Sequence, residues 1–378
     1  MEKDLEEYKE LFKNAYEEVK KENQNLDYVN LVVAGKSGVG KSTLINSVFG
    51  RQLADTGVGK PVTDKITLIE QPDFPVRIYD TVGFELAKSS FDLTNVLKNV
   101  GANDIKKLIK KSRHSEHISE HIHAVWYLIS GSGSRIEDEE MKLIKWMNDQ
   151  KLPVIVVLTK SYDRTESELL RDEINRLLPE VKATVSVLAQ STDHLEAFGI
   201  EELVEQTFHN LPESLQISFI HSQEASLKLK HSEAVKVISM SMAKSFMREA
   251  IPFAQLSTRS IFNNQIQMLA KITSIYGVNF EKKNLEKALL SMINLYESAV
   301  PKKTIKQTVD NKLGAVAKNS QGLISGGLDM IFVGALGYAY TELMSLVVKK
   351  DIDLESSSVE DITELLIELL PSFMPKMK

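Results

Sequence analysis

The sequence predicts an α/β domain with a mostly parallel sheet, preceded by one amphipathic helix and followed by an all-α domain. Short apolar runs alternate with amphipathic stretches of helical period from Tyr28 to about Leu211, which is typical of a sheet covered by helices on both faces. After Pro212 the strand signals end and long helical patterns follow. A chain of 378 residues also exceeds the size at which one hydrophobic core usually keeps growing, so at least two domains are expected.

The N-terminal segment is predicted to be a helix over residues 1–24. Its apolar residues recur at steps of three and four and form one narrow stripe, made of Leu5, Tyr8, Phe12, Ala15 and Val19. The other faces are charged. We expect this stripe to dock on the protein's own helical domain, and pairing with a partner helix is the alternative.

The remaining elements follow from apolar periodicity. The runs assigned to strands are Val29–Ala34, Val76–Tyr79, Ala124–Ile129, Val154–Leu158 and Ala183–Leu188, with Ile66–Ile69 as a candidate edge strand. The later helical patterns are Ser214–Ala250, Leu256–Tyr276, Leu285–Ser298 and Ser325–Val348. These assignments divide the chain into an N-terminal helix at 1–26, an α/β domain at 27–212 and a helical domain at 213–378.

Composition excludes several classes of site. The chain has no cysteine, which rules out disulfides, thiolate metal sites and cysteine nucleophiles and agrees with a cytoplasmic protein. The net charge of -6 argues against a general nucleic-acid partner. The apolar stretch Met330–Tyr340 is shorter than the roughly 20 residues that cross a bilayer. We expect it to be a buried helix, with peripheral contact with a membrane surface as the alternative.

One loop carries a specific chemical signal. The segment GKSGVGKS, Gly35–Ser42, matches G-x-x-x-x-G-K-[ST] in full, after an apolar strand and before a helix at 42–49. Such a loop points its backbone N–H groups at phosphate oxygens, while Lys41 reaches the β- and γ-phosphates and the Ser42 hydroxyl binds Mg²⁺. The residues that we assign to phosphate binding are Gly35, Lys36, Ser37, Gly38, Val39, Gly40, Lys41, Ser42 and Thr43.

Two further segments are expected to complete the phosphate site. Asp80 and Gly83 of the D-x-x-G sequence end a predicted strand, where the carboxylate holds the metal through a water and the Gly83 N–H senses the γ-phosphate. The Gly- and Pro-containing loop at 56–63 offers Thr63 as the residue that closes over Mg²⁺. Thr67 is the alternative, and an ordinary surface turn is another.

The base is expected at the end of the strand Val154–Leu158. Thr159-Lys160-Ser161-Tyr162-Asp163 is close to [NT]-K-x-D, in which the lysine stem packs on the purine and the acid accepts from guanine N1–H and N2–H₂. The acid comes one residue late in this chain. Either Asp163 reaches the base through a bulge, or selectivity for guanine is weak. Backbone N–H groups at Ser186 and Val187 are expected to meet the guanine carbonyl.

The order GKSGVGKS, Thr63, DTVG and TKSYD resembles the Era-like branch of the translation-factor-type GTPases. The segments GKSGVGKSTLINSVFG and VWYLISGSGSRIEDEE look closer to a bacterial subgroup in which a G domain precedes a YcjF-like helical domain. The stretch IPFAQLSTRSIFNNQIQMLAKITSIYGVNF, with ALGYAY further on, resembles that helical domain. The resemblance implies a P-loop NTPase fold, Mg²⁺ as cofactor, and GTP and GDP as substrate and product.

One departure from the family concerns hydrolysis. Many GTPases carry a glutamine after the D-x-x-G glycine to orient the attacking water, and this chain has Phe84 there. We therefore expect slow hydrolysis by the lone chain, with the absent group supplied by a homodimer through the G domain or by a partner. Arg135, Lys60 and Glu85 are the nearby polar residues that could stand in, although each is also an ordinary surface residue type.

Three functions agree with these patterns. The first is a nucleotide switch in which GTP orders the loops around Thr63 and Gly83 and the helical domain meets an unidentified protein partner. The second is a dynamin-like or immunity-related GTPase that assembles on membranes. The third is an ATPase or non-selective NTPase, which the displaced Asp163 leaves open.

A histidine-rich segment is a candidate site for a transition metal. His114, His117 and His121 would share one face if the helix continued through them, and His123 follows. Because the neighbours are Lys, Arg and Ser, we expect a solvated helix that leads into the strand at 124–129. The basic run Lys106–Arg113 is likewise expected to be a solvated helix face.

Overall fold

The chain forms two compact units, which are described separately. The computed structural model describes residues 2–54, 60–63, 66–81, 100–133, 135–249, 258–278, 281, 283–288, 290–291 and 321–373. Contacts between Cα atoms group Leu26–Ser226 into one unit, called here the G unit, and Met1–Asn25 with Leu227–Lys378 into the other, called the helical unit.

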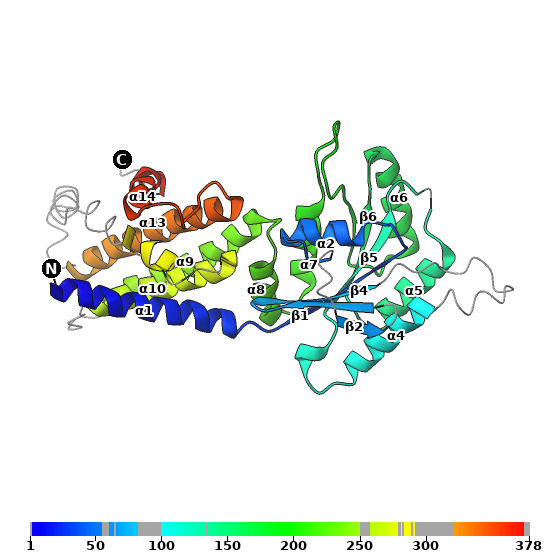
Figure 1. Ribbon diagram of the computed structural model, residues 1–378, viewed down its shortest axis with the longest axis horizontal. Coiled ribbons are helices and arrows are strands. Elements are labelled where there is room, and N and C mark those ends of the chain that lie inside the picture. The colour runs from blue at the N-terminus through cyan, green and yellow to red at the C-terminus, as the bar shows by residue number, and fades with distance from the viewer. Residues whose placement is uncertain are drawn as a thin grey trace. The chain divides into compact units, whose positions relative to one another are not determined.

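The described part of the G unit is built on a seven-stranded sheet in the order β2-β3-β4-β1-β5-β6-β7 (Figure 1). The strands are β1 Val29–Gly35, β2 Lys60–Thr63, β3 Ile66–Gln71, β4 Phe74–Thr81, β5 Ala124–Ser130, β6 Val154–Thr159 and β7 Ala183–Ser186. In this order, each strand from β4 to β7 is parallel to the next. β3 pairs antiparallel with both β2 and β4. The expected mostly parallel sheet is confirmed. The candidate at 66–69 is a strand, but β2 pairs on its outer side.

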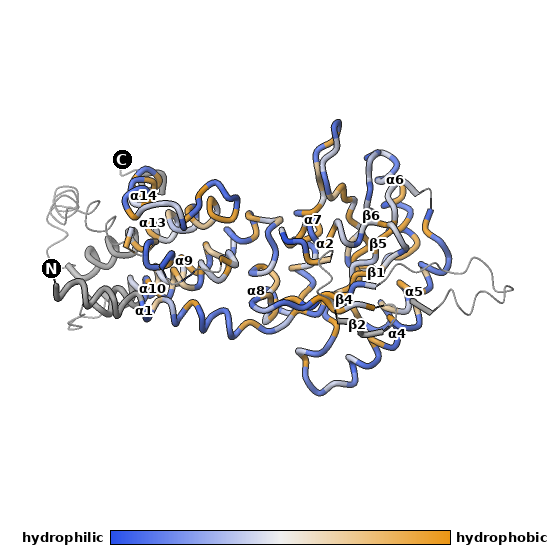
Figure 2. The backbone as a smooth tube through the Cα atoms, viewed as in Figure 1, coloured by the Kyte–Doolittle hydropathy of each residue, from blue (hydrophilic) through white to orange (hydrophobic). Residues whose placement is uncertain are grey.

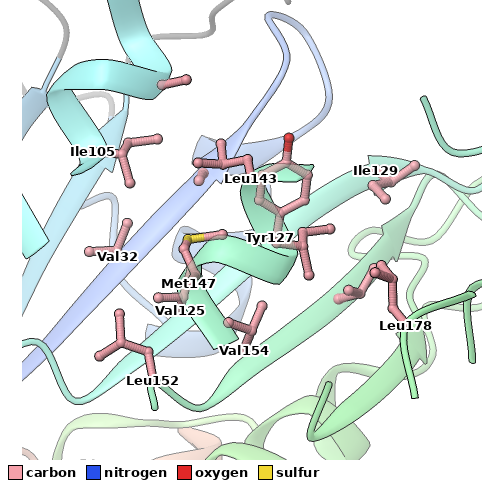
Figure 3. Close-up of a cluster of buried hydrophobic side chains, with 14 of the residues drawn as sticks. Val32, Ile105, Val125, Tyr127, Ile129, Leu143, Met147, Leu152, Val154 and Leu178 are labelled. Atoms are coloured by element: carbon pink, nitrogen blue, oxygen red, sulfur yellow. The ribbon is translucent and has the colours of Figure 1, made fainter. Parts of the chain in front are cut away.

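Helices cover both faces of this sheet. They are α2 Lys41–Phe49, α4 Val100–Arg113, the 3-10 helix η1 Ile118–Glu120, α5 Asp138–Asp149, α6 Arg164–Leu177, α7 Ile200–Asn210 and α8 Glu213–Ser222. Alternate residues of a strand point to opposite faces. In β5, Tyr127 packs with residues of α4, α5 and α6, as Figure 3 shows for Ile105, Leu143 and Met147. Trp126 faces the other layer, where it stacks on Phe49 of α2 and donates to Thr207 of α7.

The central strands are apolar along their whole length because both of their faces are covered. β1, β5 and β6 lie almost completely out of solvent, and Figure 2 shows them as hydrophobic stretches through the middle of the unit. Asn30 is the polar exception in β1. It is fully buried, and its side-chain amide donates to the carbonyl oxygens of Ser119 and His121 at 2.8 and 2.7 Å.

The histidine-rich segment differs from the expectation of one solvated helix. α4 ends at Arg113, so the three histidines that follow do not share a helical face. The chain turns because Ser115 accepts from the backbone N–H of His117 and donates to Glu120. His123 is buried rather than solvated. Within the described residues no three His, Asp or Glu side chains are grouped so as to hold a metal ion.

The helical unit contains α1 Glu2–Gln24, α9 Leu227–Glu249, α10 Thr258–Tyr276, α13 Gln321–Lys349 and α14 Val359–Phe373. α9 packs against α10 and α13, α1 packs against α10, and α14 packs against α13. Ala15 and Val19 of α1 are buried, as expected for a helix that docks on its own chain. Among the helices in the described ranges, none combines the length and the apolar character needed to cross a bilayer.

The junction between the units differs from the predicted boundary at 212/213. The single helical pattern expected over 214–250 is wrong, because α8 ends at Ser222 and α9 begins at Leu227. Between them the Gln223 side chain accepts from the Ser226 N–H and donates to the Ser226 carbonyl, which closes a turn. α8 packs on β1 and β4. The division by contacts therefore falls after Ser226.

Candidate functional site

The loop between β1 and α2, called here the phosphate loop, has a backbone that requires glycine. Gly35 has φ 151° and Gly40 has φ 105°, both in a region that other residues rarely adopt. A Cβ atom at Gly35 would lie 2.6 Å from the Leu128 carbonyl oxygen. Gly40 begins α2 without a side-chain cap, so the first N–H groups of the helix lack a capping side chain. An uncapped helix N-terminus after a tight glycine loop suits an anion.

Lys41 is buried at the inner side of this loop. Its Nζ donates to the carbonyl oxygens of Gly35 and Lys36 at 3.1 and 3.2 Å. Burial lowers the pKa of Lys41, and the neighbouring charge of Asp80 opposes that change. The ammonium is thus held at the loop with a carboxylate close by, and its contact with phosphates stays a prediction.

Asp80 lies near the end of β4, where it is the register partner of Val33 in β1 and of Thr67 in β3. Burial raises the pKa of Asp80 to about 6, and the Lys41 charge opposes this. Its Oδ1 is buried and has no hydrogen-bond partner among the described residues, and the same holds for Thr81 Oγ1. A buried carboxylate oxygen without a partner in the described residues is a donor that suits Mg²⁺, which prefers oxygen ligands.

The segment after β6, whose Thr159 and Lys160 were predicted to contact the base, also reaches the phosphate loop. Thr159 Oγ1 donates to the Val39 carbonyl at 2.6 Å, and Lys160 Nζ donates to the Gly38 carbonyl at 2.7 Å. Lys160 itself has φ 54°, an uncommon left-handed conformation. Residues about 120 positions apart in the chain are thereby fixed together at one edge of the sheet.

Asp163 has a structural role in addition to the predicted contact with the base. It is the N-cap of α6, and its Oδ1 accepts from the backbone N–H groups of Thr165 and Glu166 at 2.8 and 3.1 Å. Tyr162, which stands in the usual place of the base-reading acid, is half exposed. Both bonds use Oδ1, so a base would be bound by the other carboxylate oxygen, Oδ2. Recognition of a base by Asp163 stays a prediction.

The strand end at β7 offers less to a base than expected. The Val187 N–H already donates to the Leu158 carbonyl at 2.7 Å, and the Leu188 N–H donates to Phe198 at 3.0 Å. The Ser186 hydroxyl is buried without a hydrogen-bond partner in the described part of the chain. The predicted roles of Ser186 and Val187 therefore remain predictions. To bind the guanine carbonyl, the Val187 N–H would have to give up its bond to the Leu158 carbonyl.

The predicted switch residues are only partly described. Thr63 ends β2 and pairs through its backbone with Ile66. The alternative, Thr67, is directly opposite Asp80. Gly83, Phe84 and Glu85 lie outside the described residues, and so does the side chain of Lys60. Arg135 is exposed.

The sequence reading missed one contact of the loop. The Lys36 side chain forms ion pairs with Glu137 and Glu140 at the start of α5. These two glutamates form a capping box, in which each side chain accepts from the backbone N–H of the other. The spacing E-x-x-E before an apolar helix was visible in the sequence, but its proximity to Lys36 depends on the pairing of β1 with β5.

Comparison with known proteins shows which proteins this chain is similar to. A family model described as a 50S ribosome-binding GTPase matches residues 30–160. Cell division control protein 10 of Saccharomyces cerevisiae is 28% identical over 170 residues, covering 39% of this chain and 52% of that protein. A probable GTP-binding protein EngB of Thermoanaerobacter pseudethanolicus is 28% identical over 200 residues, covering 52% of this chain and 93% of the relative. GTPase Era of Alkaliphilus metalliredigens is 26% identical over 189 residues, covering 49% and 57%.

These similarities and the sheet topology together show the P-loop GTPase fold in the first half of the chain. The chain spans about half of the length of the first of these relatives. The residues that the family model matches, 30–160, lie within the G unit, so that match does not test the helical unit. The Era-like subgroup and the YcjF-like helical domain are therefore taken up below as parts of the proposal.

Proposed function

We propose that this P-loop GTPase domain makes the chain a Mg²⁺-dependent enzyme that hydrolyses GTP to GDP and phosphate and acts as a nucleotide switch for its helical unit. The observation that carries the proposal is the buried Lys41 ammonium beside the partly buried Asp80 carboxylate, under an uncapped helix N-terminus. An ammonium, a carboxylate oxygen without a partner and a row of backbone N–H groups are the parts that a metal-bound triphosphate needs.

Each residue has a chemical task in this proposal. The N–H groups of the phosphate loop and Lys41 bind the β- and γ-phosphates and stabilise charge that develops during transfer to water. Ser42 and Asp80 hold Mg²⁺, with Thr63 closing over it, and the ion neutralises charge on the transferred group. The Gly83 N–H is assigned to the γ-phosphate. Hydrolysis then releases the loops around Thr63 and Gly83, and the helical unit transmits that change to a protein partner.

Calorimetric titration with GDP and ADP in magnesium buffer tests the core of the proposal. We expect GDP to bind, ADP to bind at least tenfold more weakly, and chelation of Mg²⁺ to weaken GTP-analogue binding. Tighter binding of ADP would favour the ATPase alternative, and the absence of any purine-nucleotide binding would refute the proposal.

A single substitution isolates the base-reading role of Asp163. Asn caps a helix about as well as Asp, so Asp163→Asn keeps the α6 cap. It replaces one acceptor oxygen by an NH₂ group, which opposes the N1–H and N2–H₂ donors of guanine. We expect the preference for GDP over ADP to fall by at least tenfold in this variant. An unchanged preference would show that another group selects the base.

The biological role is proposed at the level of the family resemblance. The chain is assigned to the Era-like GTPases with a YcjF-like helical domain, in the cytoplasm, with the helical unit as the partner-binding part. Because Phe84 cannot orient water, a homodimer through the G domain or a partner is expected to supply that group. Single-turnover rates that rise with protein concentration would support dimerisation, and rates that are constant on dilution would argue against it.

A membrane-assembling GTPase of the dynamin-like kind is a second candidate. The observation that favours it is the packing of α1 on α10, which joins helices from both sides of the G unit into one compact unit. Co-sedimentation with anionic liposomes separates the candidates. Pelleting that depends on a GTP analogue supports this second function, and no pelleting with or without the analogue removes it.

A further inference from the structure

We propose that Lys36 is a positioning residue, whose side chain ties the phosphate loop to the N-terminus of α5 and thereby sets the place of Lys41 for the triphosphate. The inference rests on the proposed function, since it assigns a role to a side chain at the same nucleotide site. It concerns the Lys36 side chain, whereas the loop motif uses only the Lys36 backbone.

The contacts on the α5 side are specific. Lys36 Nζ lies 2.8 Å from Glu137 Oε1 and 3.5 Å from Glu140 Oε1. The Lys36 and Glu137 side chains are each 34% exposed, whereas that of Glu140 is 2% exposed. The ion pair therefore begins at the surface and ends at a buried carboxylate, where water screens charge less than on an open surface.

Glu140 gives this contact its strength. Its Oε2 accepts from the Glu137 N–H at 3.0 Å, which holds the carboxylate at the start of α5. Burial raises the pKa of Glu140, and the positive charge of Lys36 opposes that change. Tyr127 lies in the same region, and its hydroxyl is buried without a hydrogen-bond partner in the described residues. Burial raises the pKa of Tyr127, and the charge of Glu140 adds to that rise. Lys36 is the cation that offsets the burial of Glu140.

The other side of Lys36 reaches the phosphate-binding lysine directly. The Lys36 carbonyl accepts from Lys41 Nζ at 3.2 Å and from the Val39 N–H at 3.3 Å. One residue thus links the capping box of α5, through its side chain, with the Lys41 ammonium, through its carbonyl. A shift of Lys36 would move an oxygen that holds Lys41.

The rest of the loop is already fixed at its two ends. Gly35 lies against Leu128 of β5, with no space for a Cβ atom, and Gly38 and Val39 are held by Lys160 and Thr159. Lys36 is the anchor of the turn between these points. Holding a binding loop in its bound conformation before the ligand arrives lowers the entropy lost on binding, and small displacements at such a site have large effects on rate.

A different role for Lys36 would be direct attraction of phosphate by its charge. The two roles predict opposite effects of removing the glutamates. If Lys36 acts by direct charge, Glu137→Gln frees its ammonium and nucleotide affinity is unchanged or higher. If Lys36 acts by position, the same substitution loosens the loop and nucleotide affinity falls.

The experiment measures three quantities for the full-length chain: the Kd for GDP and for a non-hydrolysable GTP analogue, the single-turnover rate with GTP, and the unfolding midpoint. The variants are Lys36→Met, Glu137→Gln, Glu140→Gln and the double variant Lys36→Met/Glu140→Gln. Gln at position 140 keeps the capping box, because Gln serves there as well as Glu. The matched control is Lys142→Met with Glu139→Gln, a 2.6 Å ion pair on the exposed side of the same helix.

We expect Lys36→Met and Glu137→Gln each to weaken binding of the GTP analogue about tenfold, which corresponds to about 1.4 kcal/mol. The double variant should regain the unfolding midpoint lost in Lys36→Met, because no buried charge is left alone, but it should not regain affinity. The control pair should leave both the Kd and the rate at wild-type values.

Two outcomes would overturn the inference while the proposed function stands. Weaker binding by Lys36→Met with unchanged or tighter binding by Glu137→Gln would assign Lys36 to direct phosphate contact. Wild-type affinity and rate in all variants, with only a lower unfolding midpoint, would make the ion pair purely structural. A wild-type chain that binds no nucleotide would instead refute the proposed function itself.

Discussion

The two units treat buried polar groups in different ways. In the G unit, Asp80 Oδ1 and Ser186 Oγ lie at strand ends, buried and without partners in the described residues. In the helical unit, buried hydroxyls pair with each other across helices, as Thr273 does with Tyr340 at 2.8 Å. An unpaired buried polar group costs stability, so it persists where a ligand completes it. Such groups are not confined to the site, because Asn30 Oδ1 and the Tyr127 hydroxyl of the G unit and Asn23 Oδ1 of the helical unit are also buried without a partner in the described residues.

The helical unit uses its polar groups to fix helix register. Tyr276 and Ser345 form a second pair between α10 and α13 at 3.0 Å, and the Lys230 ammonium of α9 donates to the last carbonyls of α10, those of Ile275 and Tyr276. Such contacts satisfy carbonyls that a helix end leaves open. These side chains of α9, α10 and α13 hold helices together, whereas Asp80 Oδ1 and Ser186 Oγ, at strand ends of the G unit, have no partner among the described residues.

The largest expected effect comes from a substitution of Lys41 in the phosphate loop. Lys41→Ala removes the ammonium that the loop holds at 3.1 Å from the Gly35 carbonyl. We expect single-turnover GTP hydrolysis to fall by about 10²–10³-fold, since a preorganised charge at the transferred group is lost. The far-ultraviolet circular dichroism spectrum of the chain, which reports the helices of both units, should be unchanged. Hydrolysis within threefold of wild type would contradict the assignment of Lys41.

The second prediction sets function against stability at Asp80. Asp80→Asn should lower GTP hydrolysis about 10²-fold and abolish its dependence on Mg²⁺, because a neutral amide is a poor ligand for that ion. The unfolding free energy of the nucleotide-free protein should not fall. Burial raises the pKa of Asp80 to about 6, so the charged form is disfavoured in the fold, and a neutral isostere removes that cost. A loss of stability comparable to a core substitution would show a structural role instead.

The third prediction applies the same logic to the helical unit and expects the opposite result. Tyr340→Phe removes the hydrogen bond to the buried Thr273 hydroxyl, which keeps its bond to the Leu269 carbonyl, and should lower the unfolding free energy by about 0.5–1.5 kcal/mol. Thr273→Val alone leaves the buried Tyr340 hydroxyl without that partner, so Tyr340→Phe/Thr273→Val should cost less than the sum of the two single changes. Nucleotide Kd values should be unchanged.

Both tryptophans of the chain, Trp126 and Trp146, lie in the G unit. Denaturant unfolding followed by tryptophan fluorescence therefore reports that unit, while circular dichroism also reports the helical unit. A fluorescence midpoint that falls as far as the circular dichroism midpoint in Tyr340→Phe would show that the two units unfold together. Unchanged midpoints by both signals would show that the Tyr340 hydroxyl does not contribute.

The sequence predicted the parts of the molecule that short-range patterns encode. The glycines of the phosphate loop and the apolar runs of the central strands follow local rules, and both are found where expected. The sequence analysis assigned Lys160 to the base, and its contact with the phosphate loop is an addition from the structure. It is possible because the carboxyl ends of parallel strands meet at one edge of a sheet.

Other features depend on partners far along the chain, which no local pattern shows. The buried state of His123 depends on its hydrogen bond with Asn30 of β1, 93 positions away. The break before Leu227 depends on the packing of α8 against the sheet and on the Gln223 turn. The capping role of Asp163 was readable, since Asp begins an amphipathic helix there, but a motif reading gave that residue to the base instead. Competing local rules, rather than weak ones, caused that difference.

The smallest expected effect concerns a buried histidine far from any ligand role. His123 Nδ1 accepts from the Asn30 N–H at 2.9 Å, and Nε2 lies 3.0 Å from the Ile118 carbonyl, so the ring fits as the neutral tautomer with its proton on Nε2. Burial lowers the pKa of His123 below its ordinary value of 6.5. As pH falls through about 6.5 the unfolded chain takes up a proton that the folded chain does not, so the unfolding free energy of the G unit should decrease.

This pH dependence should appear in the unfolding of the G unit. It comes from His123, whose ring can make both of its hydrogen bonds only when it is uncharged. Denaturant unfolding followed by tryptophan fluorescence at several pH values from about 5.5 to 7.5 measures it. His123→Gln keeps an acceptor for Asn30 without a titrating ring, so the decline in stability below about pH 6.5 should become shallower. His117→Gln changes an exposed histidine and should leave the slope as in wild type. Equal slopes in wild type and His123→Gln would assign the pH dependence to other groups.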